Sequence, residues 1–179
     1  IKFTHSGFKS SKNCFNKILK KKILQKNKIL TPKYTLLSKK DLNQKKLIIL
    51  KKNYKKFVIK PNSSGSSYGI KIIKNNNNFN YFLKNIEKFK NEIPFHNYIL
   101  IEEFIPGKEL TVSSIKFSKK IEALAVTEII SKNNFFDYQA KYSKGYAKHI
   151  LPAKISKKNY NKCLNLAIKS HKLLSCRSI

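Results

Sequence analysis

A lysine and a run of small residues separate two strand-like segments near the middle of the chain. The apolar segment FVI ends at Lys60-Pro61, and the stretch NSSGSSYG follows at residues 62–69. Serine and glycine let backbone N–H groups approach an anion closely, and a neighbouring lysine adds a positive charge. The stretch lacks the GxxxxGK[ST] spacing of a P-loop, and no helix is predicted directly after it. This pattern favours a phosphate-covering loop between antiparallel strands, but a plain hairpin loop would have a similar composition.

Carboxylates gather further along, in the segment ILIEEFIPGKEL at residues 99–110. Glu102, Glu103 and Glu109 are three of only nine acidic residues in the chain. They are arranged as a strand, a break at Pro106-Gly107 and a second strand, which fits a hinge between two lobes. A third motif, DYQAKY at residues 137–142, lies in a segment without regular periodicity. Such long irregular segments within compact domains are usually functional or disordered.

The formal net charge of +30 is the most prominent feature of the composition. All but one of the 39 basic residues are lysine, and Arg177 is the single arginine. Proteins that read base edges rely on arginine, and here the lysines are scattered through every segment. Lysine and asparagine together are explained by A/T-rich coding bias, whereas nucleic-acid binding explains only the lysine. We therefore expect no specific nucleic acid, and non-specific binding of polyanions at low salt.

Other functional classes are limited by what the chain contains. No apolar run approaches the length of about 20 residues that crosses a bilayer, so no membrane partner is predicted. Cys14, Cys163 and Cys176 lack metal-type spacing, which predicts free thiols in a reducing compartment. The four histidines show no catalytic or metal-binding arrangement. The chain begins at Ile1 without methionine and ends in a segment that resembles the start of a strand, so we expect a piece of a longer protein.

Periodicity predicts an α+β fold of mostly antiparallel strands with helices covering one side. The expected strands are a short one within residues 1–11, then 33–37, 55–61, 69–74, 97–105, 109–117 and 121–130, the last two forming a hairpin. The expected helices are 12–28, one that begins after Ser38 as its cap with Asp41 three residues on, 79–92 and 157–174. Residues 75–78 and 131–152 are expected to be loops. The inner face of the helix at 79–92 is predicted to be Phe79, Phe82, Leu83, Ile86 and Phe89, and that of the last helix Cys163, Leu166, Ala167, Ser170, Leu173 and Leu174.

The motifs KPNSSGSSYGI, ILIEEFIPGKELTV and FFDYQAKYS, in this order and spacing, resemble the D-alanine–D-alanine ligase family of the ATP-grasp superfamily. The N-terminal FTHSG, with Lys17 ten residues after Gly7, also fits, and the similarity runs through essentially the whole chain. The resemblance implies an ATP-grasp fold of antiparallel sheets with covering helices, in two lobes with the nucleotide site between them. The implied divisions are 1–16, the end of an N-terminal domain and linker; 17–107, the central lobe; and 108–179, the start of the C-terminal lobe with a closing loop at 131–152.

The resemblance also implies roles for residues around the ATP phosphates and the reacting groups. Lys17 and Lys60 would hold the phosphates, and Ser66 and Ser67 would lie in the loop that covers them. Ser66 and Tyr142 are implied as the catalytic residues, because the tyrosine closes over the site and bonds the loop serine.

The remaining positions concern the nucleoside. Glu102 is implied to face the adenine amino group, and the backbone of Glu103, Phe104 and Ile105 forms the adenine hinge. Glu109 would bind the ribose hydroxyls, and Lys141 is another nucleotide contact. At Gln139 the family usually has glutamate, so the chain departs from the pattern there.

The implied reaction joins two D-alanine molecules through an acyl phosphate made from ATP, giving D-alanyl-D-alanine for peptidoglycan precursors in the cytoplasm. A homodimer is implied, with Mg²⁺ or Mn²⁺ held by ligands beyond Ile179 and none within this chain. The chain alone is therefore expected to bind nucleotide weakly and not to catalyse ligation. Three alternatives stay open: another ATP-grasp carboxylate–amine ligase, a non-catalytic remnant, and a basic nucleic-acid-binding module.

Overall fold

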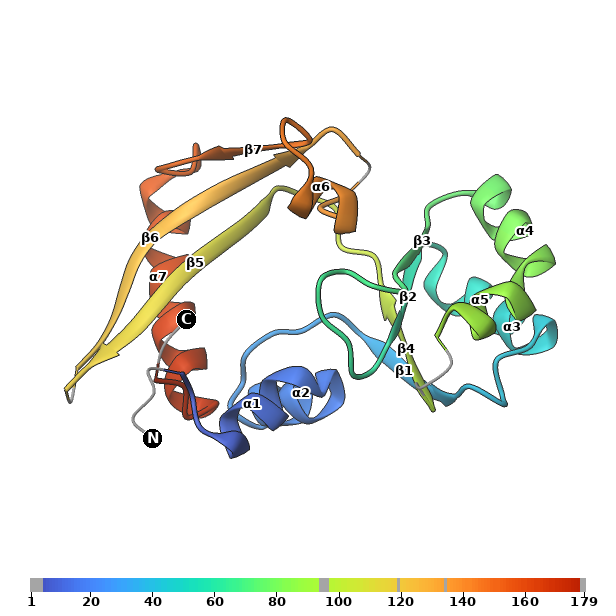
Figure 1. Cartoon of the computed structure of the whole chain (residues 1–179), viewed down its shortest axis with the longest axis horizontal. Coiled ribbons are helices and arrows are strands. Elements are labelled where there is room, and N and C mark those ends of the chain that lie inside the picture. The colour runs from blue at the N-terminus through green and yellow to red at the C-terminus, as the bar shows by residue number, and fades with distance from the viewer. Residues whose placement is uncertain (1–4, 94–96, 119, 134, 178–179) are drawn as a thin grey trace. The chain divides into compact units, whose positions relative to one another are not determined.

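The computed structural model describes residues 5–93, 97–118, 120–133 and 135–177, which form two compact units (Figure 1). One unit contains residues 16–18 and 31–106 and is called the central unit below. The other contains the chain up to Phe15 together with residues 19–30 and 107–179, and is called the hairpin unit. The change of unit after Pro106 lies next to the predicted division at residue 107. Residues 19–30 group with the hairpin unit.

The central unit is built on a four-stranded antiparallel sheet. Its strands are β1 (Tyr34–Ser38), β2 (Phe57–Pro61), β3 (Lys71–Ile73) and β4 (Tyr98–Glu103), in the spatial order β1-β4-β2-β3. Each neighbouring pair is antiparallel. The four predicted strands are confirmed, with ends one to two residues shorter than expected in most cases.

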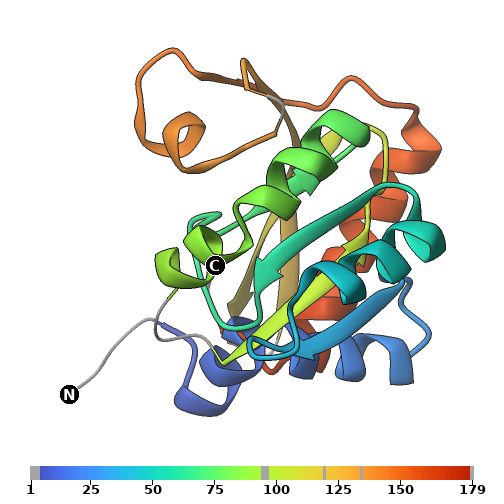
Figure 2. The same ribbon diagram turned by 90° about the vertical axis from the view of Figure 1, so that its right-hand side faces the viewer.

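Three helices cover one face of this sheet: α3 (Gln44–Tyr54), α4 (Asn76–Lys84) and α5 (Ile86–Glu92) (Figures 1 and 2). Apolar side chains from both layers form one buried cluster, because alternate strand residues point to the same face of the sheet. Phe57 contacts Phe79, and Phe82 contacts Phe89, each pair in an edge-to-face arrangement. The cluster consists of Leu37, Leu42, Leu47, Leu50, Phe57, Ile59, Ile73, Phe79, Phe82, Ile86, Phe89, Ile93, Ile99 and Ile101.

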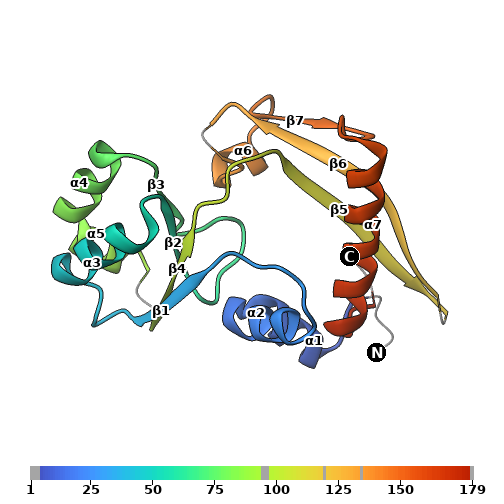
Figure 3. The same cartoon turned by 180° about the vertical axis from the view of Figure 1, so that it is seen from behind.

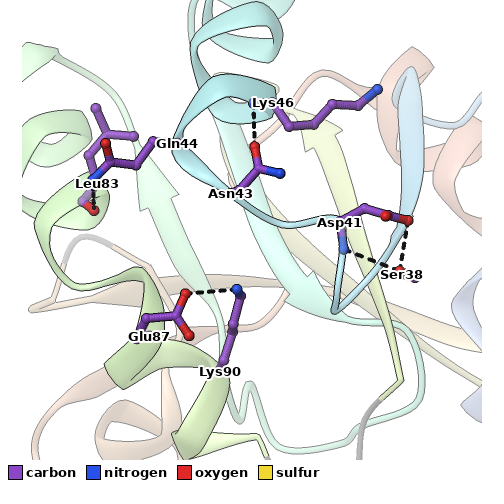
Figure 4. A network of polar contacts seen from close by, with 8 residues as sticks. All are labelled: Ser38, Asp41, Asn43, Gln44, Lys46, Leu83, Glu87 and Lys90. Atoms are coloured by element: carbon purple, nitrogen blue, oxygen red, sulfur yellow. Dashed lines mark hydrogen bonds and ion pairs between the residues drawn. The ribbon is translucent and has the colours of Figure 1, made fainter.

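The prediction that Ser38 caps a helix was wrong. Ser38 is the last residue of β1 and pairs with Tyr98, and α3 begins later with Asn43 as its cap. Ser38 and Asp41 do exchange two hydrogen bonds, but these close a turn (Figure 4). The Asn43 side chain accepts from the Lys46 N–H at 2.9 Å, which satisfies one of the free donors of the first helical turn. Pairing within the sheet therefore overrode a local capping pattern.

Two further predictions in the central unit need correction. Residues 75–78 are not a loop: Asn75 caps α4 by accepting from the Asn78 N–H at 2.8 Å, and the helix starts at Asn76. The helix expected over 79–92 is two helices, separated at Asn85. The predicted inner face was largely right, since Phe79, Phe82, Ile86 and Phe89 are buried and Leu83 is partly buried against them.

The hairpin unit contains a second antiparallel sheet, with the long strands β5 (Glu109–Phe117) and β6 (Lys120–Ser131) and the short β7 (Ala147–Ile150), in that order. The predicted hairpin is thus confirmed, although Lys119 at its turn lies outside the described residues. The register shifts between Ser113 and Ser114, a bulge in the ladder. Helix α7 (Lys157–Leu173) packs along β5 and β6 (Figure 3), and the Tyr160 hydroxyl accepts from the Val126 N–H.

The segment 131–152 is more regular than expected, because it contains the short helix α6 (Tyr138–Tyr142) and the strand β7. Helix α7 is confirmed, but its predicted inner face was partly wrong. Leu166 is 39% exposed, whereas His171, which was not assigned to that face, is buried and bonded to the Ser114 hydroxyl at 2.9 Å.

The N-terminal part is helical where it is described. Helices α1 (Phe8–Phe15) and α2 (Lys17–Lys26) replace the single helix predicted over 12–28, and they are separated at Asn16. The strand predicted within residues 1–11 is wrong from Phe8 onward, and its first four residues lie outside the described part. None of the helices in the described ranges is long and apolar enough to cross a membrane.

Candidate nucleotide site

An ion pair between Lys60 and Glu102 lies on the face of the central sheet opposite its three helices. Ile59 and Ile101 point into the apolar core, so their neighbours Lys60 and Glu102 point to the other face. In the β2–β4 register Lys60 is opposite Leu100, which makes Lys60 and Glu102 diagonal neighbours. The two side chains form an ion pair while only 19% and 9% exposed. The Lys60 ammonium and the Glu102 carboxylate are thus fixed next to each other at a position from which most water is excluded.

The Ser/Gly loop is anchored where it returns to the sheet. Gly69 has φ of +67°, and a Cβ there would lie 2.8 Å from the Pro61 ring and 2.9 Å from Ile93. The Tyr68 hydroxyl donates to the Glu92 carbonyl and fixes the same end of the loop. Glycine is therefore required at this position both for its backbone conformation and for space.

The middle of the loop adopts an unusual backbone. Ser66 and Ser67 both have positive φ values, 49° and 58°, in the left-handed region that non-glycine residues seldom occupy. Such conformations persist only where the surroundings determine them, and they are common at ligand-binding sites. These are the two loop serines that the family resemblance assigns to the phosphates.

Lys17 contacts the other end of the loop. Its ammonium group donates to the Ser64 carbonyl at 2.9 Å and to the Ser64 hydroxyl at 3.1 Å. Its backbone N–H donates to the Asn62 carbonyl, and the Ile18 N–H donates to the Asn62 side chain, each at 3.0 Å. Buried Asn62 thus satisfies two donors of the first turn of α2, and the positive end of that helix lies at the loop.

The segment predicted as the adenine hinge continues β4. The Glu103 N–H donates to the Lys33 carbonyl at 2.9 Å, and the Phe104 N–H donates to the Lys56 carbonyl at 3.1 Å. Lys74 lies over the Phe104 ring, 4.9 Å from its centroid. Among the hydrogen bonds of the described residues, the Ile105 N–H has no acceptor, and Ile105 is 58% exposed. The hinge therefore presents a backbone donor at Ile105.

The hairpin unit holds the remaining predicted residues. The Glu109 carboxylate accepts from the Phe136 N–H at 3.4 Å, and the Lys141 ammonium lies over the Phe136 ring, 5.4 Å from its centroid. Both side chains thus converge on Phe136. Tyr142 ends α6 and is 64% exposed, and its ring is 4.7 Å from that of Tyr138.

Helix α6 is short and depends on its cap. The Asp137 carboxylate accepts from the Ala140 N–H at 2.8 Å and from the Asn133 side-chain amide at 2.8 Å. The same amide also donates to Gln139, at 3.4 Å, which is the position where the family usually has glutamate. Lys141 and Tyr142 are therefore presented by a single capped helical turn.

Sequence reasoning missed a buried carboxylate on the strand that pairs with β5, opposite Leu110. Glu128 on β6 is only 8% exposed and forms an ion pair with Lys108 at 2.8 Å. The Lys154 N–H donates to Glu128 at 3.2 Å, and Lys108 also donates to the Lys154 carbonyl at 2.9 Å. The hydrogen bond from Lys108 lowers the pKa of Glu128, although burial opposes the shift. The available signal was alternation, because Glu128 lies two residues after Val126 and so points to the same, buried face of the strand.

The site residues fall into two groups, one in each unit, and no metal cluster accompanies them in the described ranges. No group of three or more His, Cys, Asp or Glu side chains there could hold a metal ion. Loop residues Asn62 and Ser64, which contact α2, were also missed, because nothing local in the sequence pairs them with it. The central unit holds Lys17, Lys60, Ser66, Ser67, Glu102, Glu103, Phe104 and Ile105, and the hairpin unit holds Glu109, Lys141 and Tyr142.

Comparison with solved structures supports the fold. D-alanyl-alanine synthetase A from Vibrio cholerae superposes with a TM-score of 0.79 at 22% identity, covering 99% of this chain and 53% of that chain. D-alanine–D-alanine ligase from Bacillus anthracis, in complex with ATP, has a TM-score of 0.68 at 27% identity and covers 99% of this chain and 53% of its own. The architecture is therefore that of the ATP-grasp ligases.

Sequence comparison identifies the same relatives. D-alanine–D-alanine ligase from Wolbachia pipientis wMel is 36% identical over 182 residues, covering 100% of this chain and 52% of the relative. The ligase from Pelagibacter ubique is 38% identical over 181 residues and covers 100% and 56%. The chain thus spans about half the length of the curated relatives it matches. Residues 23–179 match the family model described as "D-ala D-ala ligase C-terminus", and the chain therefore belongs to the D-alanine–D-alanine ligase family.

Proposed function

We propose that this chain supplies the ATP-binding part of an enzyme that ligates two D-alanine molecules and releases ADP and phosphate. The observation that carries the proposal is the ion pair between Lys60, on the strand that leads into the strained Ser/Gly loop, and Glu102 on the neighbouring strand β4, with Lys17 bonded to the loop. Water-excluded, preorganised charge is what phosphoryl transfer requires from a protein. Family membership supports the choice of reaction.

In the proposed first step a D-alanine carboxylate oxygen attacks the γ-phosphorus of ATP, the bond to the ADP oxygen breaks, and an acyl phosphate forms. Lys17 and Lys60 would bind the phosphate oxygens, and the loop containing Ser66 and Ser67 would cover them. In the second step the amine of the other D-alanine attacks the acyl carbon, phosphate leaves, and the amine loses a proton. The chain's own contribution is positive charge at the phosphates, and this charge offsets the negative charge that develops during transfer.

We assign the nucleoside to Glu102, the hinge and Glu109. The Glu102 carboxylate would accept from the adenine amino group, because a carboxylate has several acceptor sites. The Ile105 N–H would donate to an adenine ring nitrogen. Glu109 would accept from the ribose hydroxyls, and Lys141 would add charge near the phosphates.

Tyr142 and the segment around α6 are assigned to closure over the reacting groups. An acyl phosphate hydrolyses when water reaches it, so the segment has to exclude solvent during the second step. Tyr142 is exposed and lies on one capped helical turn, and in this proposal it contacts the substrate or Ser66. We therefore propose Tyr142 and Ser66 as the catalytic residues.

Four further parts of the proposal follow from the family alone. Mg²⁺ or Mn²⁺ would neutralise the phosphates when bound, with ligands outside this chain. The protein would act in the cytoplasm, where ATP is available, and as a homodimer. Residues up to 16 would be the end of an N-terminal domain and linker, residues 17–107 the central lobe, and residues 108–179 the start of the C-terminal lobe.

The test is nucleotide titration with a matched pair of lysine variants. Isothermal titration of the chain with ATP should show binding, and Lys17→Met should weaken it about tenfold or more, because a charge-assisted contact is removed. Lys90→Met is the control, since Lys90 pairs with Glu87 on α5 (Figure 4). Helix α5 packs against the apolar face of the sheet, and Lys60 points to the opposite face. Equal affinity for the two variants would contradict the phosphate role of Lys17.

The ligation itself is tested in the longer protein that carries this segment. ADP release should depend on D-alanine, and Tyr142→Phe should lower the turnover number more than it changes the KM for ATP. If ATP binds and ADP release depends on a different amino acid, the protein is another carboxylate–amine ligase. ATP binding without turnover on any amino acid would indicate a non-catalytic remnant.

A further inference from the structure

Two cysteines far apart in the sequence are in contact within the hairpin unit. The Cys14 and Cys176 sulfur atoms are 3.8 Å apart, although 162 positions separate them in the chain. Both side chains are partly buried, and the Ser10 hydroxyl donates to the Cys176 sulfur at 3.3 Å. Ser10 and Cys14 are four residues apart on α1, so both face Cys176 from the same side of that helix.

The position of Cys176 is determined by the way α7 ends. Ser175 has a positive φ of 56°, the Ser175 N–H donates to the Lys172 carbonyl, and the Cys176 N–H donates to the His171 carbonyl at 3.0 Å. This pair of bonds is a Schellman motif, which places the second residue after the helix in a defined orientation. The position of Cys176 is therefore fixed by backbone hydrogen bonds at the end of α7.

Arg177, the next residue, forms hydrogen bonds to the segment before α1 and to strand β5. The Arg177 N–H donates to the Ser6 hydroxyl at 2.9 Å, and the Arg177 carbonyl accepts from the Lys116 N–H on β5 at 2.9 Å. Ser6 lies two residues before the start of α1. The segments that carry the two thiols are thus held together independently of the sulfur contact, so the thiols remain neighbours.

We propose that Cys14 and Cys176 form a reversible disulfide by exchange with a small-molecule disulfide such as oxidised glutathione, and that this bond joins α1 to the end of α7. This proposal does not rest on the proposed ligase function. The two thiols need to approach by less than 2 Å to reach the bonding distance of about 2.05 Å, which side-chain rotation and a small shift of α1 can supply. Nothing in the family assignment concerns these two positions.

The exchange takes place in two balanced steps. The Cys176 thiolate attacks one sulfur of oxidised glutathione, a mixed disulfide forms, and one glutathione leaves as a thiol. The Cys14 thiolate then attacks the Cys176 sulfur, and the second glutathione leaves. Two protein thiols are oxidised, one glutathione disulfide is reduced, and the two protons are taken up by the departing glutathione.

We assign the second attack to Cys14, because its surroundings disfavour the thiolate form. Burial raises the pKa of the Cys14 thiol, and the neighbouring Cys176 raises it further, so Cys14 is mostly protonated at neutral pH. Lys20 lies near enough to oppose this shift, and Arg177 follows Cys176 directly, so the approach to the pair is cationic. Anionic glutathione is therefore attracted to the pair.

The test incubates the intact chain in glutathione buffers of increasing oxidation, blocks the remaining thiols and maps the peptides. The expected product is a peptide pair linked through Cys14 and Cys176, reversed by dithiothreitol, with only Cys163 still open to the blocking reagent. Because the link closes a very long loop, the oxidised chain should also melt roughly 5 °C or more above the reduced chain.

Serine variants make the test specific. Cys163→Ser is the matched control and should form the same link, whereas Cys14→Ser and Cys176→Ser should each abolish it and accumulate at most a glutathione adduct. A link that involves Cys163 would overturn the proposal. Wild-type protein that carries glutathione on Cys176 but does not form the Cys14–Cys176 bond would also overturn it. A melting temperature that falls on oxidation would contradict the claim that the bond joins α1 to the end of α7.

Discussion

At the scale of single residues, the Lys60–Glu102 pair has structural consequences as well as its proposed role with ATP. Both side chains are mostly buried, and each satisfies the charge of the other. Lys60→Met should lower the free energy of unfolding by about 3 kcal/mol, because it removes the ammonium group that forms an ion pair with a buried carboxylate. Urea denaturation measures the change, and the double variant Lys60→Met, Glu102→Leu should regain most of the loss. A double variant as unstable as the single one would show that the pair stabilises the sheet through some other contact.

Gly69 allows a second prediction at this scale, with a built-in control. Gly69→Ala should destabilise the central unit by roughly 1–3 kcal/mol, because φ is +67° and the new methyl group would overlap Pro61 and Ile93. Gly65→Ala in the same loop should be nearly neutral, since a Cβ there meets nothing within 4 Å. The midpoints of urea unfolding compare the two variants. Equal losses would mean that the loop resists any side chain, whatever its local space.

Glu128 gives a pH-dependent prediction. Because the pKa of Glu128 is lowered in the folded state, the charged carboxylate stabilises the protein at pH values above the ordinary pKa of a glutamate. This stabilisation is lost as the pH falls through the lowered pKa. Wild type should therefore be more stable than Glu128→Gln at neutral pH, and the difference should shrink on acidification. Thermal melts from pH 7 to pH 3 measure it. A difference that stays constant over this range would mean that the Lys108 contact does not depend on the charge of Glu128.

At the scale of elements, helix starts in this protein depend on asparagine caps. Asn75 accepts from the Asn78 N–H at 2.8 Å and begins a helix composed of residues with weak helix propensity. Asn75→Ala should cost about 1 kcal/mol, measured by urea unfolding, because one donor of the first turn loses its acceptor. Asn77→Ala, at an exposed position within the same helix, is the control and should be neutral or slightly stabilising. If both substitutions had the same effect, α4 would not depend on its cap.

The elements also show why two plausible local patterns failed. Ser38 followed by Asp41 is a capping signature, but the backbone of Ser38 is already paired with Tyr98 in the sheet. A run of asparagines is typical of a loop, but its first member supplies a cap, and Phe79 and Phe82 anchor the helix in the core. Burial of the aromatic face offset the low helix propensity of the asparagines. Both errors have the same cause, since long-range packing outweighed local preference.

At the scale of the whole molecule, the net charge of +30 predicts non-specific association with polyanions. Binding to duplex DNA should be strong in 20 mM salt, fall linearly with the logarithm of salt concentration and be negligible near 150 mM, with equal affinity for unrelated sequences. Fluorescence anisotropy with two DNA duplexes measures this. Affinity retained at physiological salt, or a preference for one sequence, would favour the alternative of a dedicated nucleic-acid-binding module.

The strands and the motif positions were predictable from the sequence, because apolar alternation and breakers act locally. The strand predictions for the central unit, the long hairpin and the last helix are confirmed. The pairing of strands was not predictable, because the β1-β4-β2-β3 order joins segments distant in the chain. That order is what makes Lys60 and Glu102 diagonal neighbours. The sequence therefore indicated which residues to consider, and the register showed which of them meet.

By itself, the sequence determined the α+β class from its local periodicity and the family from motifs in a fixed order, and the resemblance to that family implied the candidate site residues. Only the tertiary structure decided the contacts between distant segments: Lys17 with Ser64, Glu128 with Lys108 and Lys154, and Cys14 with Cys176. The physical reason is that hydrophobic burial in the core is not directional, whereas hydrogen bonds and sulfur contacts require atoms placed within a few ångströms. That placement comes from strand register, helix ends and close packing, which no local stretch of sequence encodes alone.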